Sequence, residues 1–312
     1  MRSPILFLIF NRPDTTIKVF EAIRQAQPPR LYIAADGPRA TKPSDLIMCT
    51  ETREIISKID WDCKVKTLFR EDNLGCGKAV SGGISWFFEN EEEGIIIEDD
   101  ILPHPDFFLY CDEMLDKYRH IESVKFISGR NALHGNSNSV DSYFFSAFNY
   151  VWGWAAWRRT WEIYDFSLKK KTMSQFCNVL DYYFKDKTVI RYWKTIFKQM
   201  KYSQIDTWDY QLTISLWFDN ALSILPNVNL VRNIGFGEGS THSTCVENVE
   251  QNLDSFPILP IKHPNMIFKQ ESSDLLIATK YRNNSYTMIK YIDWNLRFYI
   301  KLIVKYMRGL LI

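Results

Sequence analysis

The sequence predicts an α/β protein in which helices cover both faces of a mostly parallel sheet, and two observations support this class. Short apolar runs alternate with stretches of helical period through residues 1–128, which is typical of parallel strands joined by crossover helices. Runs such as Ile5–Phe10 and Leu31–Ala35 are continuously apolar, as expected for strands that are buried on both faces.

Helix and strand boundaries in this first half follow from capping and turn residues. Asp14 or Thr15 can cap a helix over Thr16–Ala26, and the turn residues Asp36-Gly37-Pro38 end the second strand. The later predicted elements are a helix near Ser44–Ile59, a strand at Cys63–Phe69, a helix over Leu74–Phe88, a strand at Ile95–Ile97, a helix at Pro105–His120 and a strand at Val124–Ser128.

Beyond residue 128 the pattern changes, because aromatic residues become more frequent and the connections between elements lengthen. No internal repeat and no low-complexity linker divides the chain, so one large domain is expected. The predicted elements are a strand at Tyr143–Phe148, helices at Thr160–Asp165, Met173–Lys185, Val189–Ser203 and Trp208–Asp219, and short strands at Leu222–Leu225 and Asn229–Arg232.

Composition excludes some classes of protein. The 312 residues carry a net charge of +1, so no global field points to nucleic acid, which is not expected as a partner. The six cysteines are spread evenly without a CxxC pair, as expected of reduced thiols in a cytoplasmic protein. The apolar run after Met1–Pro4 is too short to span a membrane and lacks a signal-peptide cleavage site.

Residues 286–312 are predicted to form a basic amphipathic helix. Such a helix can lie on an anionic membrane surface or pack on the domain as a terminal helix, and periodicity does not separate the two. Cations interrupt the segment and exclude a transmembrane span. Four of them share one helical face within Tyr291–Ile312, namely Arg297, Lys301, Lys305 and Arg308.

The strongest chemical signal is the run Glu98-Asp99-Asp100, which directly follows the apolar strand Ile95–Ile97. Adjacent carboxylates at the end of a buried strand repel one another, and a divalent cation with oxygen ligands offsets their charge. Ligands of open α/β sheets bind beyond the carboxyl ends of the strands. The position therefore suits a metal-bound, phosphorylated ligand, and a solvated acidic loop such as Glu89–Glu93 is the alternative.

The stretch Ile95–Phe108, which links Glu-Asp-Asp to Pro-Asp-Phe-Phe, resembles nucleotide-sugar-dependent glycosyltransferases of GT-A fold, closest to N-acetylglucosaminyltransferase I and its relatives. The resemblance implies a Rossmann-like, mostly parallel sheet flanked by helices, with an aromatic-rich, acceptor-facing C-terminal half. It also implies a single catalytic domain over residues 1–285, composed of a nucleotide-binding half at 1–128 and an acceptor half at 129–285.

The same resemblance assigns a role to each carboxylate. Asp100 would bind Mn²⁺ or Mg²⁺ bridging the two phosphates of a UDP-sugar, for which UDP-GlcNAc is the first guess. Glu98 and Asp99 would contact hydroxyls of the donor sugar or ribose, or orient the waters of the metal.

Three further residues are expected near the nucleotide. The resembling family has an Arg after its first strand, an Asp against the uridine after its second, and a basic, glycine-bearing start to the following helix. These features match Arg12, Asp36 and Lys78. The alternatives are that Arg12 is a surface residue of its turn and that Asp36 serves only an Asp-Gly turn.

Three tryptophans alternate with small residues in Val151–Arg158, a poor pattern for the core of a plain strand or helix. The resembling family has a Gly-Trp element under the donor sugar, so Trp154 is expected to be a sugar-facing platform. Core packing is the alternative, since aromatic residues mostly pack.

On the acceptor side, the resemblance implies an inverting reaction in which an Asp near a Trp deprotonates the acceptor hydroxyl. Asp209, within Thr207–Tyr210, is the candidate catalytic base. Asp206 is its local rival, and the alternative is an Asp at a helix N-terminus stabilised by the helix dipole.

The segment Asn233–His242 has three glycines in five residues, and its amides can cradle phosphate. The resembling family has a glycine-bearing segment ending in Ser-His that orders over the donor. Ser240, Thr241 and His242 are therefore expected to contact phosphate or metal, whereas a lone His is otherwise more often structural.

The residues thus favour a metal-dependent, inverting glycosyltransferase that uses a saccharide or lipid-linked saccharide acceptor. One alternative is a sugar-nucleotidyltransferase, but Asn11–Asp14 lacks the glycine-rich loop of that class. The other is a non-catalytic relative that binds carbohydrate or membrane. We expect a bacterial cytoplasmic enzyme of polysaccharide biosynthesis, with peripheral contact to the inner face of the cell membrane through residues 291–312.

Overall fold

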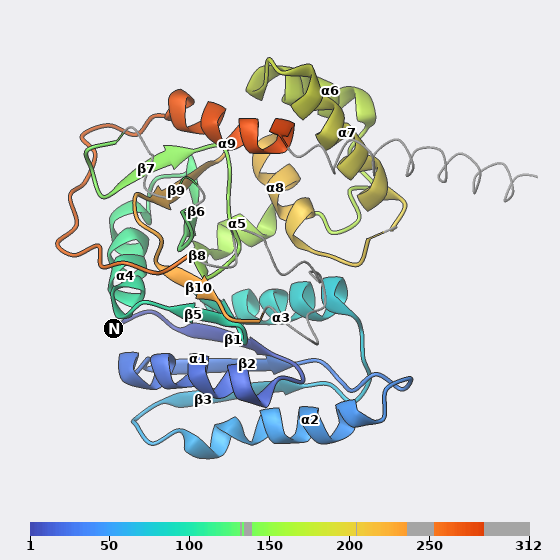
Figure 1. The fold of residues 1–312 in the computed structure, drawn as a ribbon, viewed down its shortest axis with the longest axis vertical. Helices are drawn as coiled ribbons and strands as arrows, with labels where there is room; N and C mark the ends of the chain where they lie inside the picture. Colours follow the sequence, from blue (N-terminus) through green and yellow to red (C-terminus); the bar gives the residue numbers. More distant parts are fainter. Residues whose placement is uncertain (132, 134–138, 204, 236–252, 284–312) are drawn as a thin grey trace, which may run out of the picture.

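A computed structural model describes residues 1–131, 133, 139–203, 205–235 and 253–283. The predicted α/β class is confirmed, because an eight-stranded sheet of order β3-β2-β1-β4-β8-β6-β9-β7 lies between layers of helices (Figure 1). The strands of this sheet are β1 (Ile5–Ile9), β2 (Arg30–Ala35), β3 (Lys64–Phe69), β4 (Glu93–Glu98), β6 (Val124–Ser128), β7 (Tyr143–Ser146), β8 (Trp154–Trp157) and β9 (Leu222–Pro226).

The sheet is mostly parallel and consistent with a Rossmann-like GT-A fold. Six of its strands run in one direction, and β7 and β8 oppose them. The chain passes from β1 to β2 and β3 on one side and then returns to β4 on the other side of β1. A topological switch point therefore lies between β1 and β4, which is where open α/β sheets bind ligands.

Helices connect the strands and cover both faces. The helices are α1 (Pro13–Ala26), α2 (Ser44–Arg53), α3 (Cys76–Asn90), α4 (Pro105–Tyr118), α5 (Arg158–Glu162), α6 (Met173–Tyr183), α7 (Lys187–Lys201), α8 (Asp209–Phe218) and α9 (Glu271–Asn283). A short 3₁₀ helix, Glu54–Lys58, continues α2, so the single helix predicted near Ser44–Ile59 is divided in two. Strands β5 (Ile101–Pro103) and β10 (Val231–Asn233) form a separate antiparallel pair.

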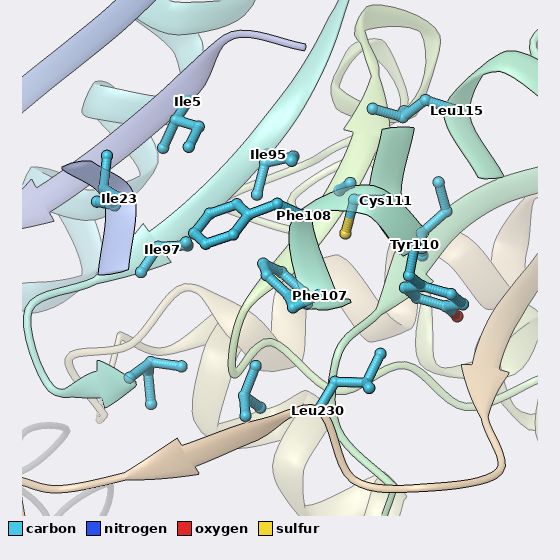
Figure 2. Close-up of a cluster of buried hydrophobic side chains, with 14 of the residues drawn as sticks. Ile5, Ile23, Ile95, Ile97, Phe107, Phe108, Tyr110, Cys111, Leu115 and Leu230 are labelled. Atoms are coloured by element: carbon cyan, nitrogen blue, oxygen red, sulfur yellow. The ribbon is translucent and has the colours of Figure 1, made fainter. Parts of the chain in front are cut away.

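Alternate residues of the parallel strands enter two different cores, as the pleat of a strand requires. Ile5 and Phe7 of β1 pack with α1 and α4, whereas Leu6 and Leu8 pack with α3, α5 and α8. Figure 2 shows the first core, in which isoleucines of β1 and β4 surround the ring of Phe108. Both faces of these strands are buried, which explains why their sequences are continuously apolar.

A third core joins the helices of the second half. α6, α7, α8 and α9 enclose rings that include Phe197, Trp193 and Trp217, and the last two meet at 4.5 Å between ring centroids. This core packs on β7 and β9 through Phe144 and Leu225. The helical layer is therefore attached to the far end of the sheet from β3.

The segment around Trp154 corrects one expectation. Trp154–Trp157 is strand β8, inserted antiparallel between β4 and β6. All four of its residues are buried, and Trp154 stacks between the rings of Phe126 and Trp208 at centroid distances of 4.9 and 5.9 Å. The pattern of small and large residues serves core packing, since Trp154 and Ala156 enter one core and Ala155 and Trp157 enter the other.

Other expectations can be compared directly. β5, β8 and α9 were not predicted, and the other elements lie close to their expected ranges. The five cysteines of the described residues are free thiols. Among these residues no helix is both long enough and apolar enough to cross a bilayer. The predicted helix at 286–312 lies outside the described residues.

Candidate active site

The carboxyl ends of four parallel strands meet at one edge of the sheet. Ile9 of β1 pairs with Ala35 of β2, which pairs with Phe69 of β3, while Leu8 of β1 pairs with Glu98 of β4. A pocket of about 450 Å³ opens at this edge. Its acidic and basic lining residues are Arg12, Asp36, Arg39, Arg70, Glu98, Asp99, Asp100 and Asp206.

The three adjacent carboxylates are placed where their charges repel. Asp99 is 7% exposed, and burial followed by the charge of Asp100 raises the pKa of Asp99 to about 7. Burial, and then the charges of Asp100, Asp99 and Asp209, raise the pKa of Glu98 well above its ordinary value. The folded chain therefore resists full ionisation of this cluster unless positive charge is brought to it.

Arg12 supplies part of that charge. Its Nη1 lies 2.6 Å from Oδ2 of Asp100 and 3.8 Å from Oδ1 of Asp99. Burial acts to lower the pKa of Arg12, but the charges of Asp99 and Asp100 outweigh it and the pKa is raised. The other Asp99 oxygen, Oδ2, accepts a hydrogen bond from the backbone N–H of Phe10 at 3.0 Å. Arg12 is thus part of the carboxylate site, and its side chain is half-buried.

The residues present fit a divalent cation. Three ionised carboxylates and one guanidinium leave a charge of −2, and carboxylate oxygens are the ligands that Mg²⁺ and Mn²⁺ prefer. No three His, Cys, Asp or Glu side chains converge on one point among the described residues. Mg²⁺ needs no such cluster, because it is commonly bound through one or two carboxylates together with water and substrate phosphates.

The two residues that follow β10 lie in close contact with this site. The N–H of Ile234 donates to the carbonyl of Asp100 at 2.8 Å. A Cβ added to Gly235 would lie 2.6 Å from Cβ of Asp100 and 2.9 Å from Nη1 of Arg12, so only glycine allows this approach. The residues expected to contact phosphate or metal, Ser240, Thr241 and His242, follow shortly after and lie outside the described residues.

Asp36 directly follows β2, and its carboxylate is hydrogen-bonded to other groups of the protein. Its carboxylate accepts hydrogen bonds from the side chain of Asn73 and from the N–H groups of Leu74 and Gly75, at 2.9 to 3.2 Å. Burial is the largest influence on Asp36 and raises its pKa, against these hydrogen bonds. The turn role considered for Asp36 is therefore present, and the residue also lines the pocket.

Asp206 caps helix α3 across the pocket. Its two carboxylate oxygens accept from the N–H groups of Cys76 and Gly77, each at 2.8 Å. Gly75 has φ +80° and would meet Asp206 if it carried a Cβ. Together Asp36 and Asp206 accept from the amides of residues 74–77, so these four donors at the start of α3 are not available to a phosphate.

Asp209 begins α8 on the other side of the carboxylates. It is half-buried, and Oδ1 accepts a hydrogen bond from the hydroxyl of Thr207. Its charge is one of the causes that raise the pKa of Glu98. A helix N-terminus favours negative charge at this position. The structure therefore places Asp209 at the start of α8, where its charge acts on Glu98, and gives its rival Asp206 a capping role.

Lys78 and Trp154, like Asp209, are not among the residues that line the pocket. Lys78 is exposed on the first turn of α3, between buried Gly77 and Ala79, and is not part of the pocket lining. The ring of Trp154 is fully buried, and its Nε1 has no hydrogen-bond partner among the described residues. In this structure Trp154 therefore supports the sheet from its core and faces no open space for a sugar.

Sequence reasoning missed two arginines of the pocket. Arg70 directly follows β3, as Asp36 follows β2, and this spacing was the available signal. Burial lowers the pKa of Arg70, opposed by the charge of Asp36. Arg39 lies over the ring of Phe10 at 5.4 Å and bonds to Asp45. This bond is the main reason that the pKa of Asp45 is lowered to about 2.

A larger pocket of about 710 Å³ lies at the opposite edge of the sheet, where the parallel strands begin. Its charges are matched locally, since Arg30 pairs with Glu91 at 2.7 Å and Arg119 with Glu93 at 2.8 Å. The uncompensated charge at the carboxyl edge makes the smaller pocket the candidate active site.

Comparisons with known proteins give partial overlaps. No protein-family model matches the chain, and no curated protein matches it. S. aureus TarS 1–349 overlaps with 12% identity and a TM-score of 0.34, over 52% of this chain and 48% of that chain. HddC from Yersinia pseudotuberculosis overlaps with 13% identity and a TM-score of 0.28, over 40% of this chain and 57% of that chain.

A third solved structure is a UDP-glucose pyrophosphorylase complexed with UDP-glucose. It overlaps with 13% identity and a TM-score of 0.30, over 52% of this chain and 79% of that chain. The overlap with TarS spans about half of the length of that structure. The argument for function therefore rests on the site itself.

Proposed function

We propose that the protein is a metal-dependent glycosyltransferase that binds a nucleotide-sugar in the pocket at the carboxyl edge of the sheet. The observation that carries the proposal is the arrangement of Arg12 with the carboxylates at the end of β4. Buried carboxylates with raised pKa values and a single guanidinium partner leave a negative site. Such a site suits a divalent cation carrying a diphosphate.

The donor side follows from the contacts of these residues. Asp100 is the proposed metal ligand, because its carboxylate faces the pocket and is 18% exposed, whereas Asp99 is held by Phe10. A divalent cation bound there would supply Lewis-acid stabilisation of charge on the departing nucleotide diphosphate. Arg12 adds a second positive group beside the same phosphates. Glu98 and Asp99 accept hydrogen bonds from hydroxyls of the sugar or ribose.

The nucleoside is proposed to lie toward β2 and β3, with uridine as the expected base. Asp36 holds the turn that shapes this end of the pocket, and the neighbouring Arg70 faces the same space. Phosphate or metal contacts from Ser240, Thr241 and His242 remain part of the proposal as sequence expectations, whereas Lys78 is left out because its side chain is exposed outside the pocket lining. The sugar platform assigned to Trp154 is not, because the ring is buried.

Asp209 is the proposed catalytic base of an inverting transfer. Thr207 holds one of its oxygens and leaves the other for the proton of an acceptor hydroxyl. The acceptor is proposed to be a saccharide or a lipid-linked saccharide, bound by the half of the protein that follows β6. We further propose a cytoplasmic enzyme of polysaccharide biosynthesis with peripheral membrane contact through residues 291–312.

The test is calorimetric titration of UDP and UDP-GlcNAc with and without Mn²⁺, together with thermal shift. Ligand at about 100 times its Kd should stabilise the fold by about 2.7 kcal/mol. Asp100→Asn should lose the Mn²⁺-dependent part of the affinity, whereas Asp62→Asn, which changes an exposed carboxylate, should bind as the wild type does. Unchanged Mn²⁺-dependent affinity in folded Asp100→Asn would overturn the proposed site.

Product analysis separates the alternative functions. Sugar transfer to an acceptor supports the proposal. Release of pyrophosphate from UTP and a sugar phosphate would instead show a nucleotidyltransferase. Binding of a glycan by a protein that ignores both UDP and Mn²⁺ would show a non-catalytic relative.

A further inference from the structure

Helix α7 carries a stripe of cations opposite its core-facing side, and its first two members are exposed while the next three are half-buried. The stripe consists of residues spaced four, three, four and three apart, which places them within one narrow arc of a helix of 3.6 residues per turn. Its buried side packs into the helical core through residues such as Trp193 and Phe197. The members of the stripe are Lys187, Arg191, Lys194, Lys198 and Lys201.

This charge is not compensated locally. Helix α7 contains no Asp or Glu, and its first four stripe cations have no ion pair with any described residue. The stripe also lies in the most basic part of the chain. Residues 169–201 contain nine Lys and Arg against two Asp, a net charge of +7 in a protein whose total is +1.

An uncompensated row of cations on a rigid helix is costly to the fold, because like charges three and four residues apart repel each other. The apolar side of α7 is already used in the core, so folding alone explains only that side. An extended anionic partner would turn the repulsion into attraction. The length of the row, about 21 Å at 1.5 Å per residue, requires a partner with charge spread over a surface.

We propose that the stripe of α7 docks the protein on an anionic lipid bilayer. Four of its five cations are lysines, which act as point charges, whereas recognition of individual phosphates favours the fork of arginine. Tyr202, which follows the stripe at the end of α7, is 59% exposed, and tyrosine suits the level of lipid headgroups. The low net charge of the whole chain argues against a nucleic-acid partner.

Helix α7, which carries the stripe, also packs against α8. The Tyr192 hydroxyl of α7 lies 3.2 Å from the hydroxyl of Tyr210, and the ring of Trp193 meets that of Tyr210 at 5.8 Å. Tyr210 directly follows Asp209. These contacts join the core-facing side of α7 to the start of α8, so the helix that carries the stripe packs directly against the helix that carries the proposed base. The membrane contact itself does not depend on the proposed catalytic function.

The experiment measures co-sedimentation of the full chain with vesicles of phosphatidylglycerol mixed with phosphatidylcholine, and with vesicles of phosphatidylcholine alone. Binding is expected only with the anionic lipid, and it should be lost between about 0.1 M and 1 M salt, as the Debye length falls from about 10 to 3 Å. Neutralising the stripe should lower the partition coefficient at least 100-fold. The variant is Lys187→Gln, Arg191→Gln, Lys194→Gln and Lys198→Gln combined.

Two variants with the same change in net charge serve as controls, and circular dichroism confirms that each is folded. The first neutralises exposed lysines elsewhere and should bind as the wild type does; it combines changes to Gln at Lys18, Lys58, Lys64 and Lys117. The second tests the C-terminal segment, with changes to Gln at Arg297, Lys301, Lys305 and Arg308.

The outcomes separate the possible partners. Retained vesicle binding by the α7 variant, with loss in the C-terminal variant alone, would overturn the proposal. Binding that depends on α7 but is made to heparin or RNA and not to vesicles would also overturn it. UDP affinity should be unchanged in the α7 variant, so failure of membrane docking is distinguishable from failure of the proposed nucleotide site.

Discussion

Replacing Asp99 with asparagine is expected to stabilise the protein at pH 8 in the absence of metal. Asn Oδ1 can still accept the hydrogen bond from the N–H of Phe10, which Asp99 now accepts at 3.0 Å. The substitution therefore removes a buried negative charge beside Asp100 and keeps the local hydrogen bond. Replacing one partner of a buried, paired carboxylate normally destabilises a protein. Here the substitution is expected to stabilise it, because the carboxylates of the cluster repel one another.

The magnitude follows from the pKa of Asp99. Its value is 3.8 ordinarily and about 7 in the folded protein. The folded state thus binds the proton more tightly than the unfolded state, and stability falls as the pH rises from about 4 through 7. A shift of about three units corresponds to about 4 kcal/mol at most. Because Arg12 also loses its contact at 3.8 Å, we expect a net gain of about 2 kcal/mol.

The assay is urea unfolding in EDTA at pH 5 and pH 8, with wild type, Asp99→Asn and the exposed control Asp62→Asn. The advantage of Asp99→Asn over wild type should be larger at pH 8 than at pH 5, because Asp99 is mostly protonated in the folded wild type at pH 5. The control should stay within about 0.5 kcal/mol of wild type. An Asp99→Asn variant that is less stable at pH 8, or equally shifted at both pH values, would refute the reasoning.

Two further predictions concern the walls of the site. Asp206→Ala should destabilise the protein by about 1 to 2 kcal/mol, because the N–H groups of Cys76 and Gly77 lose their acceptor. Urea unfolding should show that Asp206→Asn recovers most of this loss, and equal stability of Asp206→Ala and wild type would contradict the cap. Trp154→Ala should cost about 3 to 5 kcal/mol as a core truncation, with less for Trp154→Phe. Calorimetry should find the UDP-sugar affinity of folded Trp154→Phe unchanged. A loss of affinity without loss of stability would show that the ring contacts the sugar after all.

Much of the fold could be predicted because its signals are local. The strands of the first half are continuous apolar runs bounded by turn residues, and β1, β2 and β3 lie within a residue of their expected ranges. β8 was missed because its pattern of Trp, Ala, Ala and Trp has neither the length of a helix nor the alternation of an exposed strand. Its place between β4 and β6 depends on pairing with strands far away in the sequence.

The strand-end residues of the candidate site could be predicted from the sequence, whereas the roles of Asp206 and Lys78 could not. Asp36 and Glu98–Asp100 lie at the ends of parallel strands and Arg12 lies shortly after the end of another, so a parallel sheet brings them to one edge. Asp206 shows what the sequence lacks, because its carboxylate caps a helix 129 residues earlier in the chain. Lys78 lies near the start of α3, as expected, but its side chain is exposed to solvent. Its position in the sequence did not predict which way the helix would orient it.

The sequence by itself determined the α/β class, the positions of the first strands along the chain and the acidic character of the end of β4. These features depend on the hydrophobic period, on turn residues and on the change from an apolar run to adjacent acidic residues. All of these signals lie within a few positions of one another, so they can be recognised in the sequence alone. Only the tertiary structure decided that Arg12 meets Asp100, that Asp36 and Asp206 occupy the start of α3, and that Trp154 is core. Each of these depends on which distant groups come within a few ångströms, because hydrogen bonds, ion pairs and burial act over that range and not along the chain.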